Sequence, residues 1–287
     1  GEVLCSDQLG RTYIYDADTR SVVTMPDLKP KLWPLSLFVP NAGLDGHDHD
    51  DGSCGGSLFI IETVIKPEEG WSGQCSDQFE VFVYDKPTST SSCRPLPPPP
   101  FVRYPKFHNI HTKISSYAVV GGGSEVCISH TWRSLGQWTL PFNGKVEYVP
   151  ELKLWFGLSA KTQRLAAADL SALDSRPELV KTWKNELSPR KGLRESQDSQ
   201  LVNLGTGRFC IARFFGIRSL RGHRYYDQII EDYFAVLTGV EVVPCVDGDG
   251  RSCGSDNGSG QVKLQMVKHE SKLHLCNDGS SVIKAVF

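Results

Sequence analysis

The stretch LWFGLSAKTQRLAAADLSALDSRPELVKTW, Leu154–Trp183, decides the fold class of this chain. An apolar, strand-like run ends in Ala-Asp-Leu, a polar turn follows, and a second run ends at a Trp. Shorter versions, in which the first run ends in Tyr-Asp, occur at Thr12–Leu28 (TYIYDADTRSVVTMPDL) and Phe79–Pro97 (FEVFVYDKPTSTSSCRPLP). A chain that repeats hairpins in this way is typical of a β-propeller.

Strand signals dominate the rest of the chain as well. Apolar and polar residues alternate with a period of two, and Gly, Pro, Asn, Asp and Ser separate the alternating segments. The one stretch with some helical character, Leu170–Leu187, is interrupted by Pro177. The predicted strands are Arg11–Tyr15, Ser57–Glu62, Phe79–Tyr84, Tyr117–Val120, Lys145–Val149, Leu152–Gly157, Gly207–Phe214, Tyr233–Val243, Val262–His269 and Val282–Phe287.

The predicted fold class is therefore all-β, a β-propeller built from antiparallel strands. Because four-stranded blades take roughly 40–50 residues, the 287 residues predict six blades, with five to seven compatible with the length. No shift in composition divides the chain, so one propeller domain is expected over 1–287.

Composition argues against several classes of partner. The formal net charge is −2, whereas a dedicated nucleic-acid binder is usually basic. No apolar run approaches the roughly 18–20 residues that span a bilayer. The nine cysteines are odd in number and have no regular spacing, which argues against a disulfide framework and favours the reducing cytoplasm or nucleus. A monomer without a membrane partner or cofactor is the expectation.

Longer phrases resemble a known family. They are GQWTLPFNGKVEYVPELKLWFGLSA (Gly136–Ala160), LVNLGTGRFCIARFF (Leu201–Phe215), FAVLTGVEVV (Phe234–Val243) and LQMVKHES (Leu264–Ser271). These stretches resemble a plant family, much expanded in grasses, that is known as domain of unknown function sixteen-eighteen. The resemblance covers most of the chain and implies a propeller akin to kelch and F-box-associated propellers. It implies no activity, because the family is regarded as uncharacterised.

One acidic loop offers metal-ligand types. His47, His49 and Asp51 stand in the segment HDHDD, with Cys54 close by, and such groups suit zinc or another divalent cation. The alternative is a solvated acidic loop, which the surrounding glycines favour, because a metal site needs fixed geometry and a supporting shell.

No catalytic constellation is visible in the sequence. The segment Gly250–Gly254 (GRSCG) has the spacing of a G-x-S-x-G nucleophile elbow, but that chemistry needs a strand before the serine and a helix after it. Here Asp-Gly precedes the segment and Ser-Asp-Asn-Gly follows it. The match is therefore expected to be coincidental, and no catalytic residue is predicted.

A basic and aromatic patch, residues 213–226 (RFFGIRSLRGHRYY), is the strongest candidate binding site. Arginine and aromatic side chains are frequent at protein and nucleic-acid interfaces. The alternative is an exposed hairpin turn between two strands, because surface charge runs are usually only solvated. The candidate contact residues in this patch are Arg213, Arg218, Arg221, His223, Arg224 and Tyr225.

Three functions remain open at the level of the sequence. The favoured hypothesis is a binding module for a protein partner, in which rigid blades hold loops of variable sequence. A second hypothesis is an enzyme with a site in the central channel, either with or without a bound metal, since residues from different blades converge there. A third is RNA or DNA binding through the patch at residues 213–226.

Overall fold

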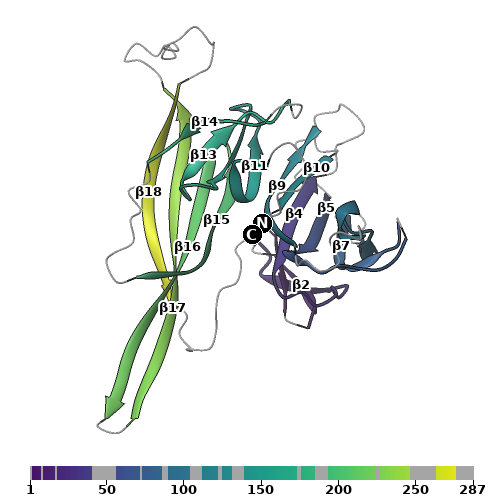
Figure 1. Cartoon of the computed structure of the whole chain (residues 1–287), viewed down its shortest axis with the longest axis horizontal. Helices are drawn as coiled ribbons and strands as arrows, with labels where there is room; N and C mark the ends of the chain where they lie inside the picture. Colours follow the sequence, from purple (N-terminus) through teal and green to yellow (C-terminus); the bar gives the residue numbers. More distant parts are fainter. Residues whose placement is uncertain are drawn as a thin grey trace. The chain divides into compact units, whose positions relative to one another are not determined.

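A computed structural model describes residues 2–7, 9–16, 18–40, 56–71, 73–85, 90–103, 112–121, 125–130, 139–172, 176–184, 193–223, 226–245 and 263–275. Over these residues the chain is all-β, with strands β1 to β18 and one short 3-10 helix, η1 (Pro100–Arg103) (Figure 1). The all-β prediction is confirmed. No helix in these ranges is long and apolar enough to cross a membrane. The chain divides into two compact units, Gly1–Ser115 with Val119–Leu135, and Ser116–Ala118 with Gly136–Phe287.

The first unit opens with a three-stranded antiparallel sheet, and the turn between its second and third strands explains the recurring Tyr-Asp phrase. The sheet orders β1 (Glu2–Ser6), β2 (Thr12–Asp16) and β3 (Ser21–Met25). Asp16 ends β2, and its carboxylate accepts hydrogen bonds from the Asp18 backbone N–H at 2.9 Å and the Thr19 hydroxyl at 2.8 Å. These bonds, the Asp18 N–H first, lower the pKa of Asp16. The Asp therefore closes the turn between two strands.

A four-stranded sheet follows in the same unit. It orders β4 (Pro34–Pro40), β5 (Gly56–Glu62), β7 (Ser76–Asp85) and β8 (Thr90–Leu96), all antiparallel. Tyr84-Asp85 again ends a strand that pairs with the next one. A small apolar cluster joins this sheet to the first one, and its buried members are Ile14, Met25 and Phe82.

Three more strands belong wholly or partly to the first unit. The two-residue β6 (Val64–Ile65) pairs antiparallel with the start of β9 (Thr112–Val120). On its other side β9 neighbours β10 (Glu125–His130). Of these three strands only β9 overlaps a predicted one, Tyr117–Val120.

The second unit holds the stretch Leu154–Trp183. Its first sheet orders β11 (Phe142–Val149), β12 (Leu154–Ser159), β13 (Leu165–Ala168) and β14 (Leu179–Thr182). Residues 116–118, which belong to this unit, pair in parallel with residues 144–146 of β11. The Asp169 carboxylate accepts the Ser171 N–H at 2.9 Å, so the Ala-Asp-Leu phrase ends its strand as Tyr-Asp does. This version of the phrase contains three strands.

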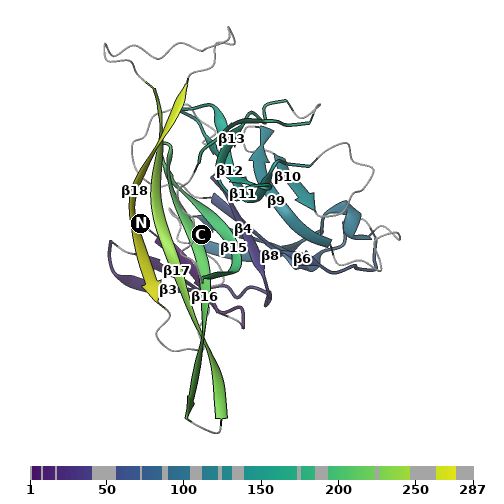
Figure 2. The same cartoon turned by 60° about the vertical axis from the view of Figure 1, so that its left-hand side comes forward.

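A meander of four long strands forms the second sheet of this unit. It runs in order through β15 (Arg194–Gly205), β16 (Arg208–His223), β17 (Tyr226–Pro244) and β18 (Leu264–Leu275) (Figures 1 and 2). Its inner face packs on the β11–β14 sheet. The buried residues of this core are Val149, Phe156, Leu158, Leu165, Ala167 and Trp183 from one sheet and its flank, and Leu201, Phe209, Ile211, Val240, Val242 and Leu264 from the other.

Candidate functional site

The predicted patch at residues 213–226 lies on the far half of the β16–β17 hairpin. Among the residues that the structure describes, β15 pairs with β16 only as far as Gly216, and β18 pairs with β17 only from Phe234 onward. Beyond these neighbours the two strands remain paired with each other, from Ile217 opposite Asp232 to His223 opposite Tyr226. We call this two-stranded part, residues 217–232, the ribbon. Figure 1 shows the hairpin running on past β15 and β18.

Arg213 lies on the inner half of the hairpin, where both neighbouring strands are present. Its guanidinium forms an ion pair with Glu195 of β15 and lies 5.3 Å from the ring centroid of Phe215. The Phe215 ring in turn stacks on Phe234, with centroids 5.4 Å apart. With its side chain 16% exposed, Arg213 braces its own sheet.

The other predicted contact residues divide into two groups. Arg218, Arg221 and His223 are on the ribbon, where they lie opposite Glu231, Gln228 and Tyr226. Arg224 and Tyr225 lie outside the described residues. Arg213, Arg218, Arg221 and His223 therefore all belong to β16, Arg213 on its inner half and the other three on the ribbon.

The predicted metal ligands His47, His49 and Asp51 also lie outside the described residues, as does Gly250–Gly254. Within the described ranges, no group of three or more His, Cys, Asp or Glu side chains is placed to hold a metal ion.

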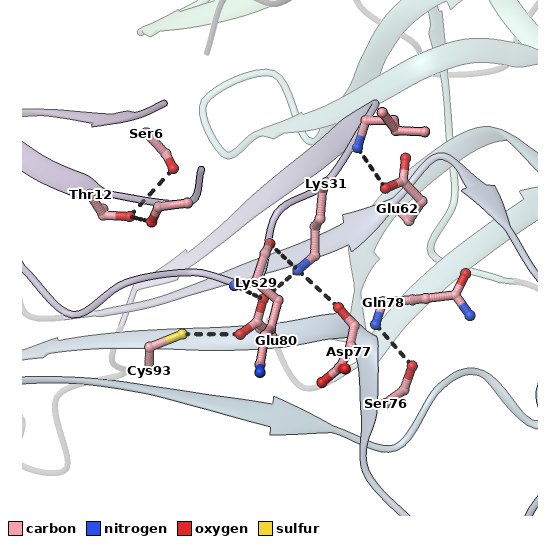
Figure 3. A network of polar contacts seen from close by, with 12 residues as sticks. Ser6, Thr12, Lys29, Lys31, Glu62, Ser76, Asp77, Gln78, Glu80 and Cys93 are labelled. Atoms are coloured by element: carbon pink, nitrogen blue, oxygen red, sulfur yellow. Dashed lines mark hydrogen bonds and ion pairs between the residues drawn. The ribbon is translucent and has the colours of Figure 1, made fainter. Parts of the chain in front are cut away.

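A buried ion pair in the first unit was not predicted from the sequence. Lys31 lies in the segment between β3 and β4, Glu80 lies in β7, and both side chains are 4% exposed (Figure 3). Besides Glu80, the Lys31 ammonium donates to the backbone oxygens of Lys29 and Asp77, each at 3.2 Å. An ammonium has three N–H groups, so all of them have acceptors. The Glu80 carboxylate also accepts the Lys29 N–H at 3.0 Å.

A second buried carboxylate holds the same segment. Glu62, at the end of β5, accepts the backbone N–H groups of Leu32 at 2.9 Å and of Trp33 at 2.8 Å. The Thr63 N–H donates to the Trp33 carbonyl oxygen at 2.8 Å. Residues 29–33 therefore have a backbone fixed by side chains and main chain of the neighbouring sheet. We call this segment the β3–β4 loop.

Cys93 of β8 is a side chain of nucleophilic type that contacts this network. Its thiol donates to the Glu80 carboxylate, with 3.6 Å between sulfur and oxygen. Burial, followed by the negative charge of Glu80, raises the pKa of Cys93 to about 11. The thiolate is the reactive form of cysteine, and at neutral pH this thiol stays protonated. The network therefore holds the β3–β4 loop in place and presents no reactive thiolate.

A similar clamp holds the segment that leads into β7. Arg103 of η1 donates to the backbone oxygens of Trp71 at 2.6 Å and of Gln74 at 2.7 Å. The same guanidinium lies 3.4 Å from the carboxylate of Glu68. Ser76 and Gln78 donate to the other oxygen of that carboxylate. Residues 68–75, which we call the β6–β7 loop, are thus fixed from both ends.

Comparison with known proteins gives a family and no activity. No curated protein matches the chain. A crystal structure described as "putative 6-phosphogluconolactonase from Bacteroides uniformis" aligns over 90% of this chain and 94% of its own, with 10% identity and a TM-score of 0.31. That score is too low to support an argument about fold or function. A family model described as protein of unknown function, DUF1668, matches residues 1–274. The expectation of a family of unknown function is confirmed, but its number was wrong: the chain belongs to the DUF1668 family of proteins of unknown function and not to family sixteen-eighteen.

Proposed function

We propose that this chain is a binding module that recognises a protein partner through the ribbon of the β16–β17 hairpin. The observation that carries the proposal is the extension of both strands beyond their neighbours in the sheet. A two-stranded ribbon is at best marginally stable by itself in water, so contact with a partner would stabilise it. A kelch-like propeller of six blades is part of the proposal and is supported by the repeated Tyr-Asp and Ala-Asp-Leu hairpins.

The ribbon sequence favours a protein over a nucleic acid. Residues 217–232 contain three arginines, Arg218, Arg221 and Arg224, and three acidic residues, Asp227, Glu231 and Asp232. Nucleic-acid affinity depends on an excess of positive charge that displaces counterions from phosphates, and this segment has no such excess. Arginine and tyrosine are, by contrast, enriched among the residues that dominate protein interfaces.

The module is further proposed to act as a monomer in a reducing compartment, the cytoplasm or the nucleus. In support, the cysteines Cys5, Cys75, Cys93, Cys127, Cys210 and Cys245 are all free thiols in the structure. Free thiols at this density are typical of proteins that work under reducing conditions.

The ribbon can be tested by shortening it. Gly216 and Tyr233 are the last residues opposite each other before the ribbon, so an Asn-Gly turn between them should close the hairpin at that point. The shortened chain should keep its melting temperature within a few degrees and lose the partners that the intact chain recovers in a pull-down. A charge-reversal variant, Arg218→Glu with Arg221→Glu and Arg224→Glu, should lose the same partners.

The matched control is reversal of two exposed lysines on the edge strand of the same sheet, Lys268→Glu with Lys272→Glu. This control should recover partners as the intact chain does. Unchanged recovery by the shortened chain would refute the proposal. Retained binding to a nucleic acid, with an affinity that falls steeply with salt and requires the arginines, would replace it with the nucleic-acid alternative.

A further inference from the structure

A proline-rich segment that begins with an arginine joins β8 to η1. The run RPLPPPP, residues 94–100, has the spacing R-x-x-P-x-x-P, in which Arg94, Pro97 and Pro100 are three residues apart. The P-x-x-P pattern is the one that the aromatic-lined grooves of peptide-binding modules recognise. Arg94 is the only charged residue between positions 87 and 102, so the segment carries a single positive charge.

The prolines restrict the backbone of this segment to a polyproline II helix. Each proline ring holds φ near −65°, and a residue that precedes a proline is confined to extended or polyproline II values. β8 ends at Leu96, η1 begins at Pro100, and residues 97–99 between them belong to neither element. A polyproline II helix has three residues per turn, so residues three apart share one of its three edges.

The burial of the side chains shows which edge faces the protein. Pro98 is buried, whereas Pro97 is exposed, and Leu96 and Pro99 are half-buried. Leu96 and Pro99 share one edge of the helix, and Pro97 and Pro98 lie on the other two. The edge of Pro98 therefore packs on the chain itself. The side formed by the other two edges remains available to a groove.

Arg94 is available to a partner as well. It lies opposite Val81 in β8, the last strand in the order β4–β5–β7–β8. Arg94 is exposed, and within the described part of the chain its guanidinium has no ion-pair or hydrogen-bond partner. A free guanidinium suits a carboxylate, with which it forms charge-assisted and often bidentate hydrogen bonds.

The segment is held at both ends. On one side Leu96 pairs with Ser76 of β7. On the other side Val102 is 3% exposed and its N–H donates to the Pro99 carbonyl oxygen at 3.0 Å, while Arg103 of η1 is bonded to the β6–β7 loop. A segment that is already ordered loses little conformational entropy when it binds, which favours affinity.

We propose that residues 94–100 are a docking motif for a protein module with an aromatic-lined groove and a carboxylate beside it. Aromatic rings of the groove would pack on Leu96, Pro97 and Pro99, and the carboxylate would pair with Arg94. The motif belongs to the first unit and uses no residue of the ribbon, so it does not depend on the function proposed above.

The test uses the intact chain and, as probes, an array of purified SH3, WW and EVH1 domains, whose grooves are of this kind. At least one domain should bind the chain, and Arg94→Glu and Pro97→Ala should each weaken that binding at least roughly tenfold. The matched controls are Arg164→Glu, at an exposed arginine between β12 and β13, and Pro95→Ala, at an exposed proline that is not one of the three spaced positions. Both controls should bind as the intact chain does. The folding of each variant is checked by its melting temperature.

A synthetic peptide of residues 92–103 separates the motif from its place in the fold. It should compete with the intact chain for the same domain, with a lower affinity because its ends are free. If no domain of the array binds the intact chain, or if a domain binds the peptide and not the chain, the inference is wrong. Equal binding by Arg94→Glu, Pro97→Ala and the two controls would also overturn it. The ribbon-shortened chain should bind the same domain as the intact chain does, so a failure of the ribbon proposal leaves this test unaffected.

Discussion

Removal of the Lys31 ammonium should be among the most destabilising single substitutions in the first unit. Lys31→Met deletes the ion pair with Glu80 and the bonds to two backbone oxygens, and it leaves a carboxylate side chain that is 4% exposed. The remaining donors to Glu80 are the Lys29 N–H and the neutral Cys93 thiol. Removing one partner of a buried ion pair costs about 3–5 kcal/mol, because the other charge stays uncompensated.

The loss should be visible in urea and in thermal unfolding followed by circular dichroism. With roughly 2–4 °C per kcal/mol for a chain of this size, the expected fall in melting temperature is roughly 6–20 °C. Lys29→Met is the matched control, because Lys29 is exposed on the same loop and such surface changes stay within about 0.5 kcal/mol. The double variant Lys31→Met with Glu80→Gln should recover much of the loss, since it removes both charges.

Two results would refute this reasoning. If Lys31→Met costs no more than Lys29→Met, the pair does not hold the β3–β4 loop. If the double variant is as unstable as Lys31→Met, the loss comes from packing of the lysine stem and not from a buried uncompensated charge.

Two further predictions concern a thiol and a turn. The free energy of unfolding should fall as pH rises from 9.0 to about 11, because the raised pKa of Cys93 lets the unfolded chain lose that proton first. Cys93→Ala should abolish this part of the pH profile. At neutral pH, iodoacetamide should label the exposed Cys5 before Cys93. In the β15–β16 turn, Gly207→Ala should lower the melting temperature more than Gly205→Ala. Both glycines have a positive φ, of 74° and 86°, but only at Gly207 would the new Cβ meet a backbone atom, the Val242 oxygen at 2.7 Å, and equal losses would contradict this explanation.

The sequence predicts those features of this chain that depend on residues close together in the sequence. The Tyr-Asp and Ala-Asp-Leu phrases end strands because Asp16 and Asp169 bond to main-chain N–H groups two residues on. Trp155 and Trp183, which lie in or beside apolar runs of the sequence, are 8% and 7% exposed. These are short-range effects, and one sequence is enough to show them.

Long-range pairing accounts for what the sequence did not show. The predicted strand Gly207–Phe214 continues as β16 to His223, through Gly216 and Gly222, because each residue has a partner on β17. Strand pairing thus overrides the weak strand preference of glycine. The arrangement of the blades and the closure of a ring depend on contacts of this kind throughout, so the propeller remains a proposal.

The clamp around Glu80 had one local signal that was missed. In the run FEVFVY, alternation puts Glu80 on the same face as Phe82, which is 2% exposed, and a carboxylate on a buried face requires a partner. The partner, Lys31, lies in a loop between two strands, 49 residues earlier in the sequence. Nothing near Lys31 in the sequence indicates that pairing, because a lysine in a loop is usually solvated.

The free end of the β16–β17 hairpin can unfold locally while the rest of the second unit stays folded. Its strands can part from His223 and Tyr226 back to Ile217 and Asp232 without breaking any pairing of β15 or β18 among the described residues. Local opening of this end therefore needs much less free energy than global unfolding, and its amide hydrogens should exchange with solvent well before those of the inner half. For a partner that binds only the closed hairpin, the free energy of closing it reduces the binding free energy. The affinity would therefore depend on the fraction of free chains whose hairpin is already closed. Substitutions that favour closure, such as a better turn, would strengthen binding without touching the partner.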